Sequence, residues 1–170
     1  MREHSRDAMH EVLAMAVPVL HGHCRDPWTL IGSAAAWLAG ADVLVADLDV
    51  LTSVHDAERL IDYWQTQLDT AYRPGGTERF RSRFARFRVS GMPVEVMGGL
   101  ELFAADGWQR VQVDEIHTVT CAGVAVPIPS VPEQIRLLES FGRPKDKERA
   151  ALLRAASLRK PINTATDLLR

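Results

Sequence analysis

The sequence has little cysteine and no long uninterrupted apolar run. Its 170 residues include only two cysteines, Cys24 and Cys121, which are too few for a disulfide framework, so we expect reduced thiols. The most apolar stretch, residues 31–52, is interrupted by Asp42, Asp47 and Asp49. It therefore lacks the roughly 18 consecutive apolar residues of a membrane-spanning helix.

An excess of charge of one sign is also missing. With 20 Lys and Arg against 22 Asp and Glu, the net charge is −2, so the total charge favours neither a nucleic acid nor an anionic membrane as partner. The total charge does not exclude a local basic patch. The first 17 residues mix charges through their first turns and lack the apolar core and cleavage site of a secretory signal. We therefore expect a soluble, cytoplasmic protein.

Apolar periodicity and capping signals predict several helices. Ser33 is expected to cap a short Ala-rich helix that Gly40 ends, and Ser53 and Ser130 each begin a capping-box pattern. Gly142 is expected to end the helix that Ser130 begins. The predicted helices are residues 9–20, 34–39, a helix from Ser53 with apolar positions Leu60, Ile61, Trp64 and Leu68, residues 130–140, and residues 147–158 before Pro161.

Short Val- and Leu-rich segments between these helices predict strands. The predicted strands are residues 28–31, 43–51, 83–89, 93–97, 108–113, 118–121 and 124–128, with a hairpin formed by the third and fourth and a tight turn at Ala122 and Gly123. Helices and strands do not alternate strictly, so the order indicates an α+β fold. We expect one domain over residues 1–170, with about 130–170 as a helical C-terminal extension.

Two carboxylates lie near the end of the apolar stretch. Asp47 and Asp49 are two positions apart, so in a strand both point to one face while Leu48 and Val50 point to the other. Adjacent carboxylates repel, and a divalent cation such as Mg²⁺ or Mn²⁺ removes the conflict. Glu95, in a later predicted strand, is the third acid that would complete a metal site for phosphoryl transfer. The alternative for Glu95 is a solvated side chain on an open sheet face.

The pair Gly32-Ser33 stands between a predicted strand and a predicted helix. A turn there presents backbone N–H groups, a hydroxyl and the positive end of the helix dipole, which together bind phosphate. Glycine suits this position because the backbone must approach the ligand closely.

These motifs resemble those of the nucleotidyltransferase superfamily, whose fold is that of polymerase beta. The stretches "IGSAAAWLAG" and "ADLDVLTS" are similar to its Gly-Ser helix start and Asp-x-Asp strand, and "GRPKDKERAALL" resembles an element of AbiEii-like proteins. Lincosamide-type and minimal nucleotidyltransferases show a similar pattern. The resemblance covers approximately residues 28–153.

The resemblance implies a function and a site. It implies transfer of a nucleoside monophosphate from a nucleoside triphosphate (NTP) to a hydroxyl acceptor, which would be a small molecule, a protein or RNA. The implied catalytic roles are Mg²⁺ ligands for Asp47 and Asp49, and metal ligand or general base for Glu95. Gly32, Ser33, Lys145 and Arg143 are implied to contact the phosphates. Asp146 would orient Lys145 or cap the last helix. Roles in antibiotic resistance or in toxin–antitoxin systems are among those that the resemblance suggests.

The sequence departs from the family pattern at two places. The third acid is Glu95, where relatives most often have Asp, and Val45-Ala46 stand where many relatives have Arg followed by Thr or Ser. An alternative is therefore a catalytically inactive protein of the same fold that binds nucleotide or acts as an interaction module.

Other groups favour structural interpretations. The series of arginines from Arg79 to Arg88 is typical of the solvated face of an edge strand, with a basic rim for RNA as the alternative. His21, His23 and Cys24 match no zinc pattern, and Cys121 has no evident histidine partner for catalysis.

Overall fold

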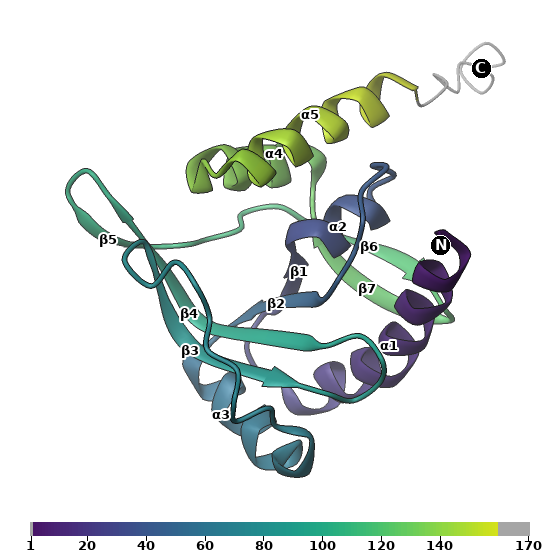
Figure 1. Cartoon of the computed structure of the whole chain (residues 1–170), viewed down its shortest axis with the longest axis vertical. Helices are drawn as coiled ribbons and strands as arrows, with labels where there is room; N and C mark the ends of the chain where they lie inside the picture. Colours follow the sequence, from purple (N-terminus) through teal and green to yellow (C-terminus); the bar gives the residue numbers. More distant parts are fainter. Residues whose placement is uncertain (1, 160–170) are drawn as a thin grey trace, which may run out of the picture.

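A mixed five-stranded sheet forms the centre of the fold. The computed structural model describes residues 2–159 (Figure 1). The sheet order is β1 (Thr29–Ile31), β2 (Leu48–Thr52), β4 (Val94–Ala104) and β3 (Phe80–Phe87), and β5 (Gly107–Arg110) pairs with the far end of β4. Only the β2–β4 pairing is parallel. The α+β class is confirmed.

One face of the sheet packs against two helices and carries the larger core. α1 (Arg2–His23) and α3 (Val54–Tyr63) lie on this side (Figure 1). Leu48 and Val50 from β2 and Val94 and Val96 from β4 are fully buried there. Because strand side chains alternate, these four residues direct their neighbours Asp49 and Glu95 to the opposite face.

The opposite face is only partly covered. α4 (Val131–Phe141) packs on it through Leu137 and Phe141, which contact Leu51 and Leu100. α5 (Pro144–Arg159) lies beside α4 and α2 (Gly32–Leu38), sharing a small cluster of buried alanines and leucines. α4 and α5 thus stand on the side away from α1 and α3 (Figure 1). The predicted C-terminal helix pair is confirmed.

A separate hairpin flanks the first strand. β6 (Ile116–Cys121) and β7 (Val124–Pro129) form a two-stranded sheet whose turn is Ala122-Gly123, both with positive φ, as the sequence predicts. The Thr29 hydroxyl donates to the Pro127 carbonyl at 3.1 Å, which ties this hairpin to β1.

Most helix boundaries predicted from capping residues are confirmed. Ser53 accepts from the Asp56 N–H at 3.1 Å and Ser130 from the Glu133 N–H at 3.4 Å. Gly142, with φ of 70°, ends α4 in the left-handed conformation. The hairpin predicted from residues 83–97 is also confirmed, as β3 and β4, although both strands are longer.

Several boundary predictions are wrong, including the start of α5, which lies at Pro144 and not at Lys147. α1 continues through Pro18 and Gly22 to His23. α2 begins at Gly32, with Ile31 at the cap position, so Ser33 is a buried residue of the first turn and does not cap the helix. α3 stops at Tyr63 because a 3-10 helix, η1 (Gln65–Gln67), follows, and this leaves Leu68 outside it. β5 ends at Arg110, since residues 111–115 turn away to reach β6.

The strand predicted over residues 43–51 is also corrected. β2 begins at Leu48, and residues 41–47 form an irregular segment that leads from α2 into the sheet. Asp47 therefore lies immediately before the strand. Pro161 and the rest of residues 160–170 lie outside the described residues, so the assignment of residues 1–170 to one domain stays a prediction. No helix of the described part is long and apolar enough to cross a membrane.

A buried carboxylate connects α3 to the segment before β1. The Asp56 carboxylate accepts from the N–H groups of Arg25 and Asp26 at 2.9 and 3.0 Å and from the Thr52 hydroxyl at 2.9 Å. Arg59 donates to it at 3.0 Å. Burial by itself raises the pKa of Asp56, but these hydrogen bonds together lower it below the ordinary value.

We predict that Asp56→Ala destabilises the protein by about 3 kcal/mol, because it leaves buried donors without an acceptor. Asp56→Asn should also destabilise it, since an amide N–H₂ would face donors. The lowered pKa means that the Asp56 contribution is complete above the unfolded-state value of about 4 and is lost as pH falls below it. Urea unfolding at pH 7 and pH 3 measures this. Asp62→Ala, at an exposed position of the same helix, should change stability by less than about 0.5 kcal/mol.

Candidate functional site

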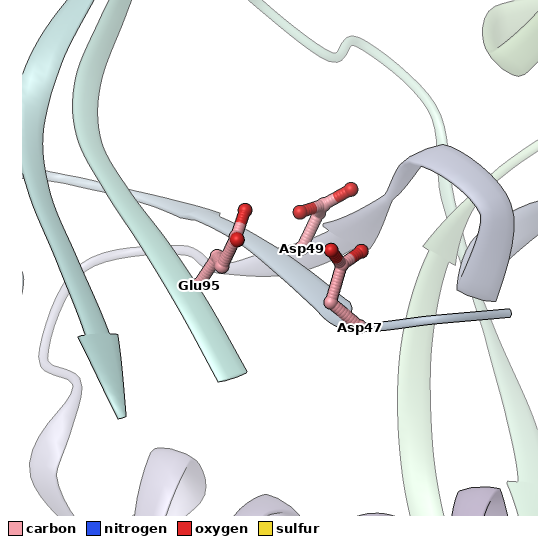
Figure 2. Close-up of side chains that lie close together, drawn as sticks. All are labelled: Asp47, Asp49 and Glu95. Atoms are coloured by element: carbon pink, nitrogen blue, oxygen red, sulfur yellow. The ribbon is translucent and has the colours of Figure 1, made fainter. Parts of the chain in front are cut away.

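Strand register places two of the predicted acids side by side. In the parallel β2–β4 pair, Asp49 stands opposite Glu95, and their neighbours are buried in the core on the other face. Asp47 precedes β2, and its carboxylate reaches the same side (Figure 2). The sequence-based expectation that Glu95 lies near the two aspartates is therefore met.

The three carboxylates form one cluster. One oxygen from each of Asp47, Asp49 and Glu95 lies within 4.8 Å of the others. Figure 2 shows the three side chains directed into a common space. Glu95 is buried and the two aspartates are partly exposed, so the cluster opens toward solvent on the aspartate side. An all-carboxylate donor set fits Mg²⁺ or Mn²⁺, which prefer oxygen ligands.

Electrostatics at the cluster favour a cation. Burial, together with the charges of Asp47 and Glu95, raises the pKa of Asp49 well above its ordinary value. Burial and the charge of Asp47 also raise the pKa of Glu95, and the ion pair with Arg86 opposes this. A bound cation would relieve the repulsion between the carboxylates.

Gly32 forms one wall of the cluster. Its φ is +69°, and a Cβ built on it would lie 2.6 Å from Oδ2 of Asp49. Glycine is required here for two reasons, the left-handed backbone and the space that the Asp49 carboxylate fills. Ser33, next along the chain, is buried at the start of α2. The predicted Gly-Ser element therefore directly adjoins the acid cluster.

Comparison with known proteins identifies the fold. No family model and no curated protein sequence matches the chain. Among solved structures, a candidate nucleotidyltransferase from Thermotoga maritima matches with a TM-score of 0.65 and 25% identity, covering 85% of this chain and 91% of its own. The chain has the nucleotidyltransferase fold.

More distant matches agree with this fold. The lincosamide antibiotic adenylyltransferase LnuA, solved with lincomycin, matches with a TM-score of 0.57 and 11% identity over 86% of this chain and 96% of its own. ANT(2")-Ia, solved in complex with adenylyl-2"-tobramycin, matches with a TM-score of 0.53 and 12% identity over 88% of each chain. At these identities the likeness concerns the fold alone.

Helix α5 brings positive charge toward the cluster of this nucleotidyltransferase fold. The charges of Lys145 and Arg149 both act on Asp49. Arg143 is engaged differently: its guanidinium donates to the buried Asp146 carboxylate at 2.6 and 3.1 Å and lies 4.9 Å from the Phe80 ring centroid. Asp146 also accepts from the Arg143 N–H, so it caps α5 and binds Arg143. Among the described residues it forms no hydrogen bond or ion pair with Lys145.

Arg81, Arg83 and Arg86 of the arginine series lie on an edge strand, β3, and Arg79 and Arg88 directly flank it. Arg81 pairs with Glu101 at 2.7 Å, Arg83 with Glu58 at 2.5 Å and Arg88 with Asp69 at 3.2 Å. Arg79 lies over the Phe80 ring. These contacts agree with the edge-strand interpretation. Arg86 differs from the others because it points to the acid cluster and pairs with Glu95 at 2.7 Å.

The histidine and cysteine residues have other contacts. His21 Nε2 lies 2.7 Å from the Ala125 carbonyl, and the His23 ring stacks on Tyr63. Burial and the Asp56 charge raise the pKa of the Cys24 thiol to about 12, so it is a poor metal ligand and nucleophile. Burial also raises the pKa of Cys121. Within the described residues, the acid cluster is the one group of three such side chains that could hold a metal.

A groove of about 660 Å³ lies toward the other end of β2, lined by Trp28, Leu51, Val54, Leu100 and other residues. None of the three acids lines it. The chemistry of the cluster, not the size of the groove, therefore identifies the candidate site.

Sequence reasoning missed three residues around the cluster. Arg149 could have been found from its i,i+4 spacing from Lys145, which places both residues on one face of α5. Arg86 and Tyr72 had no such signal, because their proximity to Glu95 depends on strand register and on the course of the loop before β3.

We predict that Gly32→Ala weakens Mn²⁺ binding by about tenfold, because the new methyl group displaces the Asp49 carboxylate. Isothermal titration with Mn²⁺ measures the change. Gly40→Ala is the matched control: Gly40 also has positive φ, +100°, but open space around its Cβ position. The control should lose about 1 kcal/mol of stability through backbone strain and keep wild-type Mn²⁺ affinity. Equal losses of affinity in both variants would refute the steric explanation.

Proposed function

We propose that this protein is a Mg²⁺-dependent nucleotidyltransferase, which moves a nucleoside monophosphate from an NTP to a hydroxyl acceptor. The observation that carries the proposal is the convergence of Asp47, Asp49 and Glu95 on one face of a sheet with the nucleotidyltransferase fold. A cluster of three carboxylates is costly unless a cation compensates it, so the arrangement is difficult to explain by stability alone.

Asp47, Asp49 and Glu95 would hold the metal. When bound, the cation would neutralise triphosphate charge and polarise the α-phosphate. The partly exposed side of the cluster, next to the two aspartates, is where the substrate phosphates would approach.

The triphosphate would lie between the Gly32-Ser33 turn and α5. Gly32 and Ser33 would offer backbone N–H groups and a hydroxyl to the β- and γ-phosphates. Lys145 and Arg149, whose charges already reach Asp49, would compensate the phosphate charge from the other side. Arg143 would contribute less to phosphate binding than its charge suggests, because its guanidinium forms an ion pair with Asp146.

The reaction exchanges one phosphoester bond for another. The acceptor oxygen attacks the α-phosphorus, the bond from the α-phosphorus to the bridging oxygen of the β-phosphate breaks, and pyrophosphate leaves. The acceptor proton would pass to Glu95, whose Oε1 is bound by Arg86 and whose Oε2 remains for the acceptor or the metal. Most of the rate would come from positioning and charge compensation.

The acceptor class is the open part of the proposal. LnuA and ANT(2")-Ia were solved with antibiotics or their adenylylated product, so a small hydroxyl compound is one candidate class for this chain. A protein hydroxyl is a second. RNA is the third, with Arg79 to Arg88 as its contact, and it requires the ion pairs of these arginines to open.

We predict Mg²⁺-dependent transfer of label from an α-³²P-labelled NTP to a component of a cell extract. Each of the four NTPs should be tested, and products should be separated into small-molecule, protein and RNA fractions. Asp49→Asn should reduce the label to background. Asp106→Asn, at an exposed turn away from the cluster, should leave it unchanged. Mg²⁺-dependent NTP binding without transfer to any fraction would support the inactive-protein alternative.

We predict that the double variant Lys145→Gln/Arg149→Gln weakens NTP binding on the order of tenfold, because both charges act at the cluster. Mn²⁺ affinity in the absence of NTP should stay the same or rise, since two positive charges near the cluster are removed. Lys147→Gln, exposed on the same helix, is the control and should bind NTP as the wild type does. Fluorescent NTP titration measures all three proteins. Unchanged NTP affinity in the double variant would contradict the placement of the triphosphate beside α5.

A further inference from the structure

Four strands contribute to one row of residues across the sheet. Ile31 of β1 stands opposite Asp49 of β2, Asp49 opposite Glu95 of β4, and Glu95 opposite Arg86 of β3. We refer to these four residues as the transverse row. It places the Gly32-Ser33 turn at one end of the acid cluster and Arg86 at the other, so the site has a phosphate side and an arginine side.

Arg86 makes a direct, largely buried contact with the third acid. Its Nη1 donates to Oε1 of Glu95 at 2.7 Å. The side chains of Arg86 and Glu95 are only 16% and 12% exposed. A charge-assisted bond shielded from water is considerably stronger than the exposed pairs of Arg81 or Arg83 on the same strand.

The guanidinium of Arg86 is itself held from its other sides. The Tyr72 ring lies over it, with 4.2 Å between Cζ and the ring centroid. Nε is buried without a hydrogen-bond partner and lies 3.8 Å from Oδ2 of Asp69. Asp69 also accepts from the N–H of Tyr72 at 3.2 Å and so shapes the loop that carries the ring. Arg86 is therefore fixed before any ligand arrives.

This arrangement explains how a glutamate can take the third position. Glu95 has one more rotatable bond than aspartate, and an unrestrained side chain would lose rotamer entropy on binding a cation. Because Arg86 binds Oε1, the carboxylate plane is set and Oε2 is left for the cluster. Glu95 thus loses its rotamer entropy when the protein folds and not when the cation binds.

We propose that Arg86 is a positioning residue, which holds the Glu95 carboxylate in the orientation that a divalent cation requires. The inference rests on the proposed metal site and adds a residue that acts through Glu95 without touching substrate. For the loss of Arg86, the positioning role and simple charge repulsion predict changes of cation affinity that are opposite in sign. Removing a positive charge near the site should tighten cation binding by Coulomb's law, whereas loss of a positioning residue should weaken it.

We predict that Arg86→Gln weakens Mn²⁺ binding about tenfold, measured by isothermal titration and by electron paramagnetic resonance of free Mn²⁺. Arg86→Lys, which keeps the charge and one donor, should recover part of the affinity. Arg81→Gln is the control and should bind Mn²⁺ as the wild type does. It removes a charge from the same strand, together with an exposed ion pair to Glu101 and a contact with the Trp108 ring, neither of which involves the cluster.

A double-mutant cycle tests whether Arg86 acts through Glu95. Glu95→Gln alone and Glu95→Gln with Arg86→Gln should bind Mn²⁺ equally weakly, because the second change has nothing left to orient. Thermal unfolding without metal checks that each variant folds. If Arg86→Gln does not fold, Tyr72→Ala, which uncovers the guanidinium, provides a second route and should weaken Mn²⁺ binding by a smaller factor.

The outcomes separate this inference from the proposed function. Wild-type protein that does not bind Mn²⁺ would overturn both. Wild-type binding together with unchanged or tighter binding by Arg86→Gln would overturn the positioning role and leave the metal site in place. Additive losses in the double-mutant cycle would also overturn it, since Arg86 would then act independently of Glu95.

Discussion

The parallel pairing of β2 with β4 is the constraint on which the rest of the site depends. Asp49 and Glu95 become neighbours only because Leu48 stands opposite Val94 and Thr52 opposite Gly98. A shift of one residue in either strand would turn the acid of that strand into the core and its buried aliphatic side chains outward. The four fully buried side chains Leu48, Val50, Val94 and Val96 make that shift prohibitive, so the hydrophobic core beneath the sheet fixes the position of charged groups above it.

The two fully buried aspartates and the acid cluster differ in the partners that the fold gives them. Asp56 and Asp146 are fully buried and each is surrounded by N–H, hydroxyl or guanidinium donors. Asp47 and Asp49 face each other and Glu95, and no ion pair is formed by either aspartate within the described residues. Folding thus gives Asp56 and Asp146 close donors, whereas in the described part of the chain it gives Asp47 and Asp49 no ion pair. Glu95 stands between these classes, since Arg86 binds one of its oxygens.

The sequence predicted those features that depend on local chemistry. Ser53, Ser130 and Gly142 marked helix ends correctly because a cap involves residues three or four positions apart. The acids of the cluster were also predicted, from the spacing of Asp47 and Asp49 and from the family resemblance, although Asp47 lies just before β2 and not within it. Ser33 failed as a cap because helix α2 begins two residues earlier than predicted, at Gly32, which adopts a left-handed conformation beside Asp49. The environment of Arg86 depends on strand register and on the loop that carries Tyr72, which no local pattern encodes.

The acidic and the basic residues of the proposed site are synthesised at different times. All three carboxylates lie between residues 47 and 95, whereas Lys145 and Arg149 follow on the last described helix. During synthesis, which proceeds at roughly 5–20 residues per second, a ribosome completes the acidic half several seconds before it adds the basic half. A nascent chain thus contains every proposed metal ligand before it contains the α5 cations. Shortening the protein from its C-terminal side would remove the nucleotide contacts proposed for α5 before any of the three carboxylates.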